Sequence, residues 1–108
     1  MRLILASASP RRRELLRMLV PAFECDAADI DEAMLCDELP ADYVCRMSSE
    51  KAARVWVPGS VVLGADTTVV CHGRVLHKPD SFADAEGMLR SLSGLTHEVM
   101  TSVTLMSD

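Results

Sequence analysis

Residues 3–16 have the sequence LILASASPRRRELL, and this stretch decides the fold. Its apolar run, residues 3–6, predicts a buried strand. Pro10 is favoured at the first position of a helix, where its missing N–H costs nothing, and Ser9 before it is the expected N-cap. The helix is expected to continue with an apolar face built at helical spacing from Leu15, Leu16, Met18 and Leu19. The local prediction is therefore a strand, a tight loop and the amino terminus of a helix.

Arginines occupy the first turn of this predicted helix, at positions 11–13. Cations are favoured at the opposite end of a helix, and each misplaced one costs roughly 0.3–1 kcal/mol when exposed. The arrangement makes sense if an anion completes the site, because guanidinium N–H groups match phosphate oxygens. The alternative is a solvated basic turn that pairs with Glu14 or with acidic residues elsewhere. The residues alone leave both interpretations open.

The composition is that of one globular domain with a modest core. The chain has 108 residues, of which 49% are hydrophobic and 4% aromatic, so Leu, Val, Met and Ala must form the core. The net charge of -5 argues against a general nucleic-acid binder, which would carry a basic surface. The local basic residues fit a small anionic ligand better than a polymer.

The sequence shows no targeting signal, and this together with the cysteine spacing leads us to expect a cytoplasmic protein. The longest apolar run is too short to span a membrane, and the amino-terminal run leads into arginines instead of a cleavage site. The four cysteines show no C-x-x-C spacing. We interpret them as reduced, mostly buried thiols, and a disulfide or a zinc site is the less favoured alternative.

The rest of the chain divides into short predicted elements. Two helices are expected, one from Pro40 to the stop at Pro58-Gly59 and one over residues 83–92 with Ser81 as its cap. Strand signals are β-branched runs, alternation and a hairpin turn at His72-Gly73. The predicted strands cover residues 23–26, 61–63, 69–71, 74–76 and 96–106.

Asp66 is the most unusual residue of the predicted sheet. It follows Gly64 and Ala65 inside an apolar run, and small residues there indicate that another group approaches the backbone closely. A buried, unpaired carboxylate would be costly, so a functional role for Asp66 is one interpretation. The alternative is a bulge in which the carboxylate caps backbone N–H groups.

Two other charged regions have an ordinary interpretation of their own. The acidic residues between 26 and 32 are most simply a solvated loop, although one of them could bind a metal ion. Lys51, on the second predicted helix, is most simply a surface residue.

Motifs spread over nearly the whole chain favour functional interpretations of these charged residues over the ordinary ones. S-x-S-P-R-R at 7–12 is followed by E-K-A at 50–52, G-A-D-T at 64–67, K-P at 78–79 and L-S-G-x-T-H-E-V at 92–99. In this order they resemble the Maf family of nucleoside triphosphate pyrophosphatases. Within the family, G-A-D-T and L-S-G-x-T-H are most similar to the branch that acts on dTTP and UTP.

The resemblance implies a reaction and a set of site residues. Water attacks the α-phosphorus of a nucleoside triphosphate, and the products are a monophosphate and pyrophosphate, a step that serves the housecleaning of the nucleotide pool. A divalent cation, Mg²⁺ or Mn²⁺, is the implied cofactor. The implied roles are proton acceptor for Asp66, nucleotide selection for Arg11 and Thr67, phosphate binding for Ser9, Arg12, Lys51 and Lys78, and metal binding for Glu32 and Asp66, with Asp31 as a rival to Glu32.

The resemblance also implies the architecture. We expect an α/β fold of the Maf and ITPase-like kind, a mixed sheet flanked by helices, in a single domain over residues 1–108. This domain matches only the amino-terminal half of the family, so the chain looks truncated, as a fragment or as a natural short form. The expected partner is the nucleotide, with no nucleic acid polymer and no membrane, and a homodimer is left open.

Two other functions compete with this one. The chain could be a catalytically inactive remnant that binds nucleotides or regulates septum formation. It could also be a phosphate-binding domain unrelated to Maf, which would require the ordered motifs to be coincidence.

Overall fold

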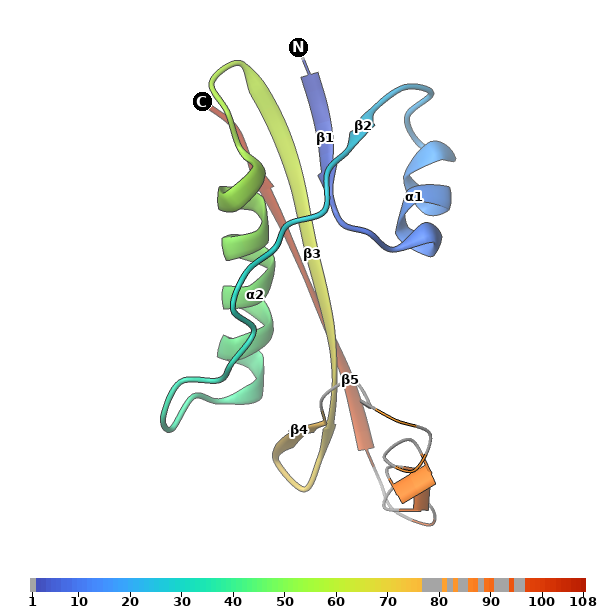
Figure 1. Cartoon of the computed structure of the whole chain (residues 1–108), viewed down its shortest axis with the longest axis vertical. Coiled ribbons are helices and arrows are strands. Elements are labelled where there is room, and N and C mark those ends of the chain that lie inside the picture. Colours follow the sequence, from blue (N-terminus) through green and yellow to red (C-terminus); the bar gives the residue numbers. More distant parts are fainter. Residues whose placement is uncertain are drawn as a thin grey trace.

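The computed structural model describes residues 2–76, 81, 83, 86–87, 89–90, 94 and 97–108. In this part of the chain a mixed five-stranded sheet is accompanied by helices (Figure 1), and the described residues 83, 86–87 and 89–90 are helical as well. The α/β fold with a mixed sheet is therefore confirmed. In chain order the elements are β1 (Arg2–Ala6), α1 (Pro10–Arg17), β2 (Glu24–Cys25), α2 (Pro40–Val55), β3 (Ser60–Cys71), β4 (Arg74–Leu76) and β5 (His97–Met106).

Strand β3 is the centre of the sheet. Along one edge it pairs antiparallel with β5, from Val62 to Cys71. Along the other edge it pairs parallel with β1 as far as Gly64, and antiparallel with β4 from Val69 onward. Among the described residues, 65–68 therefore have no strand partner on that second edge. This gap lies at the carboxyl end of β1, where open α/β sheets bind their ligands.

The side chains of β3 alternate between two environments. The even-numbered residues face α2, and the hydrophobic core on that side consists of Ile4, Ala6, Ala52, Val55 and Val62. Gly64 lies so close to α2 that a Cβ atom there would come within 2.4 Å of the Ser48 carbonyl oxygen. The close approach predicted at Gly64 is confirmed, and the approaching group is the helix backbone.

A buried set of hydroxyl groups joins α2 to β5. The Ser48 hydroxyl donates to the Cys45 carbonyl oxygen at 3.0 Å and lies 2.8 Å from both Ser102 Oγ and Thr104 Oγ1. A hydroxyl has one proton to donate and two lone pairs to accept with, so Ser102 and Thr104 act as donors to Ser48. Ser48 is fully buried and its bonding capacity is used completely. These bonds fix the position of α2 along the sheet.

Two expectations about burial are wrong. Helix α1 ends at Arg17, and Met18 and Leu19, expected on its apolar face, are 81% and 82% exposed. The chain leaves the helix in a turn after Arg17, and Leu19 lines an open cavity between α1 and the sheet instead of packing in a closed core. Three of the four cysteines are exposed, because they lie on the short edge strand β2, in the following loop and on the outer side of α2; only Cys71 is buried.

The expected hairpin turn is confirmed. His72 and Gly73 both have positive φ, 52° and 73°, as a two-residue hairpin turn requires, and they connect β3 to β4. No disulfide joins the four cysteines. Among the described residues, no helix has the length and apolar character needed to cross a membrane. Of the helix expected over residues 83–92, the described residues 83, 86–87 and 89–90 are helical, and the other half of that range, like Lys78, lies outside the described residues.

Candidate active site

The loop after β1 begins the site. Ser9 has extended backbone angles, and its Oγ accepts a hydrogen bond from the Arg12 backbone N–H at 3.3 Å. The Ser9 N–H in turn donates to Ser7 Oγ at 3.1 Å. The predicted N-cap is confirmed, and the amino terminus of α1 starts directly beside the gap in the pairing of β3.

The Arg12 side chain crosses into that gap. Its Nη1 donates to the Ala65 carbonyl oxygen at 3.2 Å, and its Nη2 donates to Thr67 Oγ1 at 3.1 Å. These two bonds use two of the five N–H groups of a guanidinium. The sequence left open a pairing of Arg12 with Glu14. In the structure, Arg12 is instead held by the edge of β3.

Three charged side chains from separate elements meet on the α2 side of β3. Lys51 Nζ lies 2.9 Å from Asp66 Oδ1 and 3.4 Å from Glu32 Oε1. The side chains of Lys51 and Asp66 are only 16% and 12% exposed, so Lys51 is not the surface residue of its simplest interpretation. Strand β3 runs through Asp66 with unbroken pairing to β5, so the alternative of a bulge is wrong.

This arrangement bears on the expected metal ion. Within the described part of the chain, no three His, Cys, Asp or Glu side chains gather closely enough to hold a metal by themselves. Glu32 and Asp66 nevertheless converge on one positive charge, the Lys51 ammonium. Two carboxylates with further ligands from substrate phosphates are an ordinary Mg²⁺ site, so the donor set fits the cation only when a nucleotide completes it.

Arg12 lines three cavities, which differ in the other predicted site residues that line them. The cavity of about 490 Å³ is lined by Ser9, Arg12, Glu32 and Lys51, which include the described phosphate-binding candidates. The cavity of about 300 Å³ adds Asp66 and Thr67 to Arg12, Glu32 and Lys51. The third cavity, of about 510 Å³, lies on the other face of the sheet and is mostly apolar, with Arg11 and Thr67 in its lining.

The segment that carries Glu32 is attached to α2 by two side chains that the sequence interpretation did not assign to the site. The Tyr43 hydroxyl donates to the Glu32 carbonyl oxygen at 2.6 Å. Burial raises the pKa of Tyr43, and the negative charges of Asp66 and Glu32 raise it further. Arg46 forms an ion pair with Glu38 at 2.7 Å, which lowers the pKa of that carboxyl group. An acidic run followed by Tyr and Arg one helical turn apart was the available signal.

Comparison with known proteins identifies the family. The profile described as Maf-like protein matches residues 2–108. The chain belongs to the Maf family. Its S-x-S-P-R-R, E-K-A and G-A-D-T motifs thus bring Arg12, Lys51 and Asp66 to one place in the Maf fold, as the geometry above describes.

Curated relatives within the Maf family are similar over nearly the whole chain. A dTTP/UTP pyrophosphatase of Vibrio parahaemolyticus is 52% identical over 109 residues, which cover 98% of this chain and 58% of the relative. A dTTP/UTP pyrophosphatase of Anaeromyxobacter dehalogenans (strain 2CP-1) is 57% identical over 102 residues, covering 94% of this chain and 52% of the relative. The chain therefore spans somewhat more than half the length of these relatives.

Proposed function

We propose that this chain provides the phosphate-binding and catalytic part of a nucleoside triphosphate pyrophosphatase that hydrolyses dTTP and UTP to the monophosphate and pyrophosphate. The observation that carries the proposal is the convergence of Lys51, Asp66 and Glu32 beside Arg12 at the gap in β3. The names of the similar relatives support the same reaction and the same substrates.

The cationic groups bind the triphosphate. Arg12 is held at the edge of β3 through two N–H groups, and its other donors can reach phosphate oxygens in the adjoining cavities. Ser9 and the amino terminus of α1 line the same space. Lys51 would move from Glu32 toward the phosphates when the substrate binds. Lys78 is proposed as a further phosphate ligand on the resemblance alone.

Asp66 is the proposed proton acceptor for the attacking water. Its carboxylate has one oxygen on Lys51 and lines the cavity of about 300 Å³, where a water molecule can be held next to the α-phosphate. Transfer of the proton to Asp66 gives the hydroxide that attacks phosphorus, and pyrophosphate leaves with the electron pair of the broken P–O bond. Arg12 and Lys51 stabilise the charge that develops on the leaving group.

A divalent cation fits the same geometry. Mg²⁺ or Mn²⁺ bound by Glu32 and Asp66 together with phosphate oxygens would neutralise the substrate and help to ionise the water. Glu32 is the appropriate first carboxylate because it lies beside Lys51, whereas the Asp31 side chain accepts a hydrogen bond from the Ala33 N–H.

The third cavity is the proposed site of the nucleobase. Thr67 lines both this cavity and the cavity that contains Asp66, and Arg11 lines the third cavity from the α1 side. A base placed there would contact apolar side chains and two polar ones, which fits the roles of Arg11 and Thr67 in nucleotide selection. We further propose a cytoplasmic location and no nucleic acid or membrane partner.

A nucleotide panel tests the proposal. The protein is incubated with Mg²⁺ and each of dTTP, UTP, dCTP, dATP and GTP, and pyrophosphate is measured. We expect the fastest release from dTTP and UTP, and none from dTMP, which has no anhydride bond. Equal or faster release from GTP would contradict the proposed specificity, and nucleotide binding without release from any triphosphate would favour the inactive alternative.

A further inference from the structure

The residues between β2 and α2 form a long segment without helix or strand, and this segment carries Glu32. The Glu32 side chain is 55% exposed, and its contact with Lys51 is 3.4 Å, longer than a good hydrogen bond. Such a contact is too weak to place a carboxylate by itself. The position of Glu32 must therefore depend on what holds the backbone around it.

Tyr43 holds that backbone at Glu32 itself. The hydroxyl of Tyr43 donates to the Glu32 carbonyl oxygen at 2.6 Å, and Tyr43 is buried on the first turns of α2. A phenol ring on a helix has few rotamers, so its hydroxyl is a fixed point. The bond therefore sets the distance between Glu32 and α2, which also carries Lys51.

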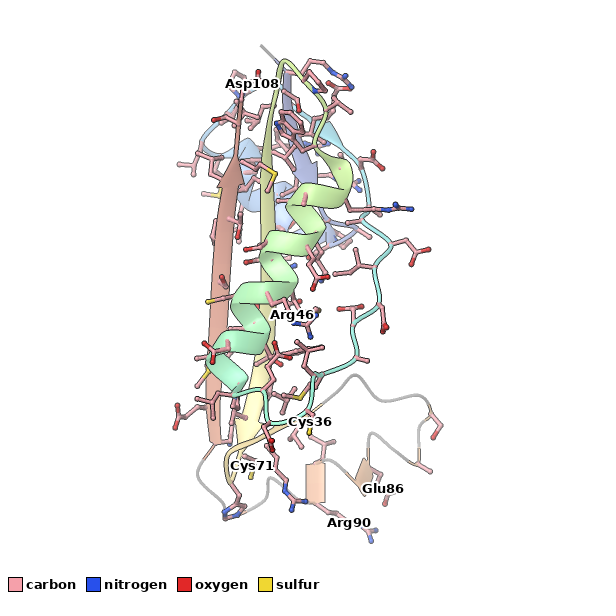
Figure 2. All side chains as sticks on the ribbon, turned by 90° about the vertical axis from the view of Figure 1, so that its left-hand side faces the viewer. Cys36, Arg46, Cys71, Glu86, Arg90 and Asp108 are labelled. Carbon is pink, nitrogen blue, oxygen red and sulfur yellow. The ribbon has the colours of Figure 1, made fainter. Side chains whose placement is uncertain are left out.

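Arg46 holds the segment at two further points, and Figure 2 shows its side chain projecting from α2. Its Nη2 donates to the Ala33 carbonyl oxygen at 2.9 Å. Its Nε and Nη2 also bind the two carboxylate oxygens of Glu38 at 2.7 and 2.8 Å, and Glu50 receives Nη1 at 2.6 Å. The Glu38 side chain is only 7% exposed, so this fork is shielded from water.

We propose that Tyr43 and Arg46 are positioning residues that hold residues 32–38 on α2, so that the Glu32 carboxylate faces Lys51 and Asp66. Tyr43 lines the cavity of about 300 Å³ together with Glu32, but the positioning role requires no contact of either side chain with the substrate. The structural claim stands on the contacts alone, while its consequence for metal binding and turnover rests on the proposed function.

The chain contains a matched control for this fork. Arg2 binds both carboxylate oxygens of Glu24 through Nε and Nη2, at 2.8 and 2.9 Å. This second fork joins β1 to the edge strand β2, and both of its side chains are more than half exposed. Glu24→Gln and Glu38→Gln thus remove the same charge from the same kind of contact, at two different places.

Hydrogen exchange of the nucleotide-free chain tests the structural claim. In Glu38→Gln, backbone amides in residues 32–38 should exchange faster by about tenfold or more, the factor that corresponds to one lost charge-assisted hydrogen bond. Amides of β3 should keep their protection, and Glu24→Gln should leave residues 32–38 unchanged. Unaltered exchange of residues 32–38 in Glu38→Gln would overturn the proposal, as would an equal acceleration throughout the chain.

Tyr43→Phe tests the consequence for the metal ion, because it removes the hydroxyl and keeps the ring. The concentration of Mn²⁺ needed for half-maximal dTTP hydrolysis should rise several-fold, while the rate at saturating Mn²⁺ should recover toward that of the unchanged protein. A rate that saturating Mn²⁺ does not restore would contradict a positioning role. If the unchanged protein hydrolyses no triphosphate, the proposed function fails, and the exchange experiment still decides the positioning claim.

Discussion

The two faces of β3 differ in what they cover and what they leave exposed. The face toward α2 is covered and holds the hydrophobic core, yet it also carries the charged Asp66 and meets the buried hydroxyl of Ser48. The face toward α1 is largely open, yet β5 contributes apolar side chains to it, with Val99, Val103 and Leu105 between 62% and 67% exposed. A charged group is thus placed among buried residues under a helix, while several apolar side chains remain at the surface.

This difference indicates a division of work between the faces. A carboxylate under a helix is tolerated because Lys51 pairs with it, and such a charged group in a low-dielectric setting acts strongly on a substrate. An open apolar face suits contact with a flat, uncharged group or with another protein surface. We therefore assign the phosphate chemistry to the α2 face and recognition to the α1 face.

The largest effect should come from Asp66→Asn, which removes the charge and keeps the size. In a preparation that turns over dTTP, kcat should fall by about 10²–10⁴-fold, the usual contribution of general-base assistance. The dissociation constant for dTTP should change little, because Arg12 and Lys51 are the proposed phosphate ligands. Turnover close to that of the unchanged protein would remove Asp66 from its role and weaken the contrast between the faces. Circular dichroism must first show that the variant is folded.

Gly64→Ala should have the next largest effect. The new Cβ would meet the Ser48 carbonyl oxygen at 2.4 Å and the Ala52 backbone nitrogen at 3.0 Å, and a helix backbone cannot move aside locally. We expect a loss of about 1–3 kcal/mol in the free energy of unfolding, measured with urea. Val103→Ala on the open face should cost less than about 0.5 kcal/mol. Similar losses in both variants would show that the two faces are packed alike.

Ser48→Ala should be less damaging than Gly64→Ala but still measurable. It leaves the hydroxyls of Ser102 and Thr104 without their shared buried acceptor, which should cost about 1–2 kcal/mol of unfolding free energy. Ser49→Ala is the control, because the Ser49 hydroxyl makes a single exposed contact of 3.3 Å with Thr104. If the two alanine variants unfold at the same urea concentration, the buried hydroxyl set does not stabilise the α2 face.

The smallest change in stability should follow from charge on the open face. Val103→Lys and Leu105→Lys should alter the unfolding free energy by no more than about 0.5 kcal/mol, because both side chains are mostly exposed. The same substitutions should shift self-association of the chain toward monomer, since they interrupt its exposed apolar surface. Sedimentation velocity at several concentrations measures both the unchanged chain and the variants. A chain that is monomeric without the substitutions would contradict the second expectation.

Local sequence signals predicted the elements well and their mutual placement less well. Ser9-Pro10 predicted the start of α1, and His72-Gly73 predicted the turn after β3, because each depends on backbone preferences of adjacent residues. The end of α1 was predicted too late, since the apolar spacing of Leu19 carries no signal for the turn that begins at Met18.

The site shows the same limit. The family resemblance indicated Lys51 and Asp66, but their direct ion pair depends on how α2 packs on β3, and that is set by Gly64. Asp66 was expected inside an apolar run, with a bulge as the alternative, and pairing with β5 extends β3 through it without a bulge. Tyr43 and Arg46 were not assigned to the site, because the loop that they hold has no periodicity of its own.

The most direct test of this account is a crystal structure of the protein with a non-hydrolysable dTTP analogue and Mn²⁺, in which anomalous scattering locates the metal. The account predicts phosphates against Ser9, Arg12 and Lys51, manganese between Glu32 and Asp66, and the base in the apolar cavity beside Thr67. Phosphates bound on the α1 face, or manganese away from both carboxylates, would contradict the assignment of phosphate chemistry to the α2 face.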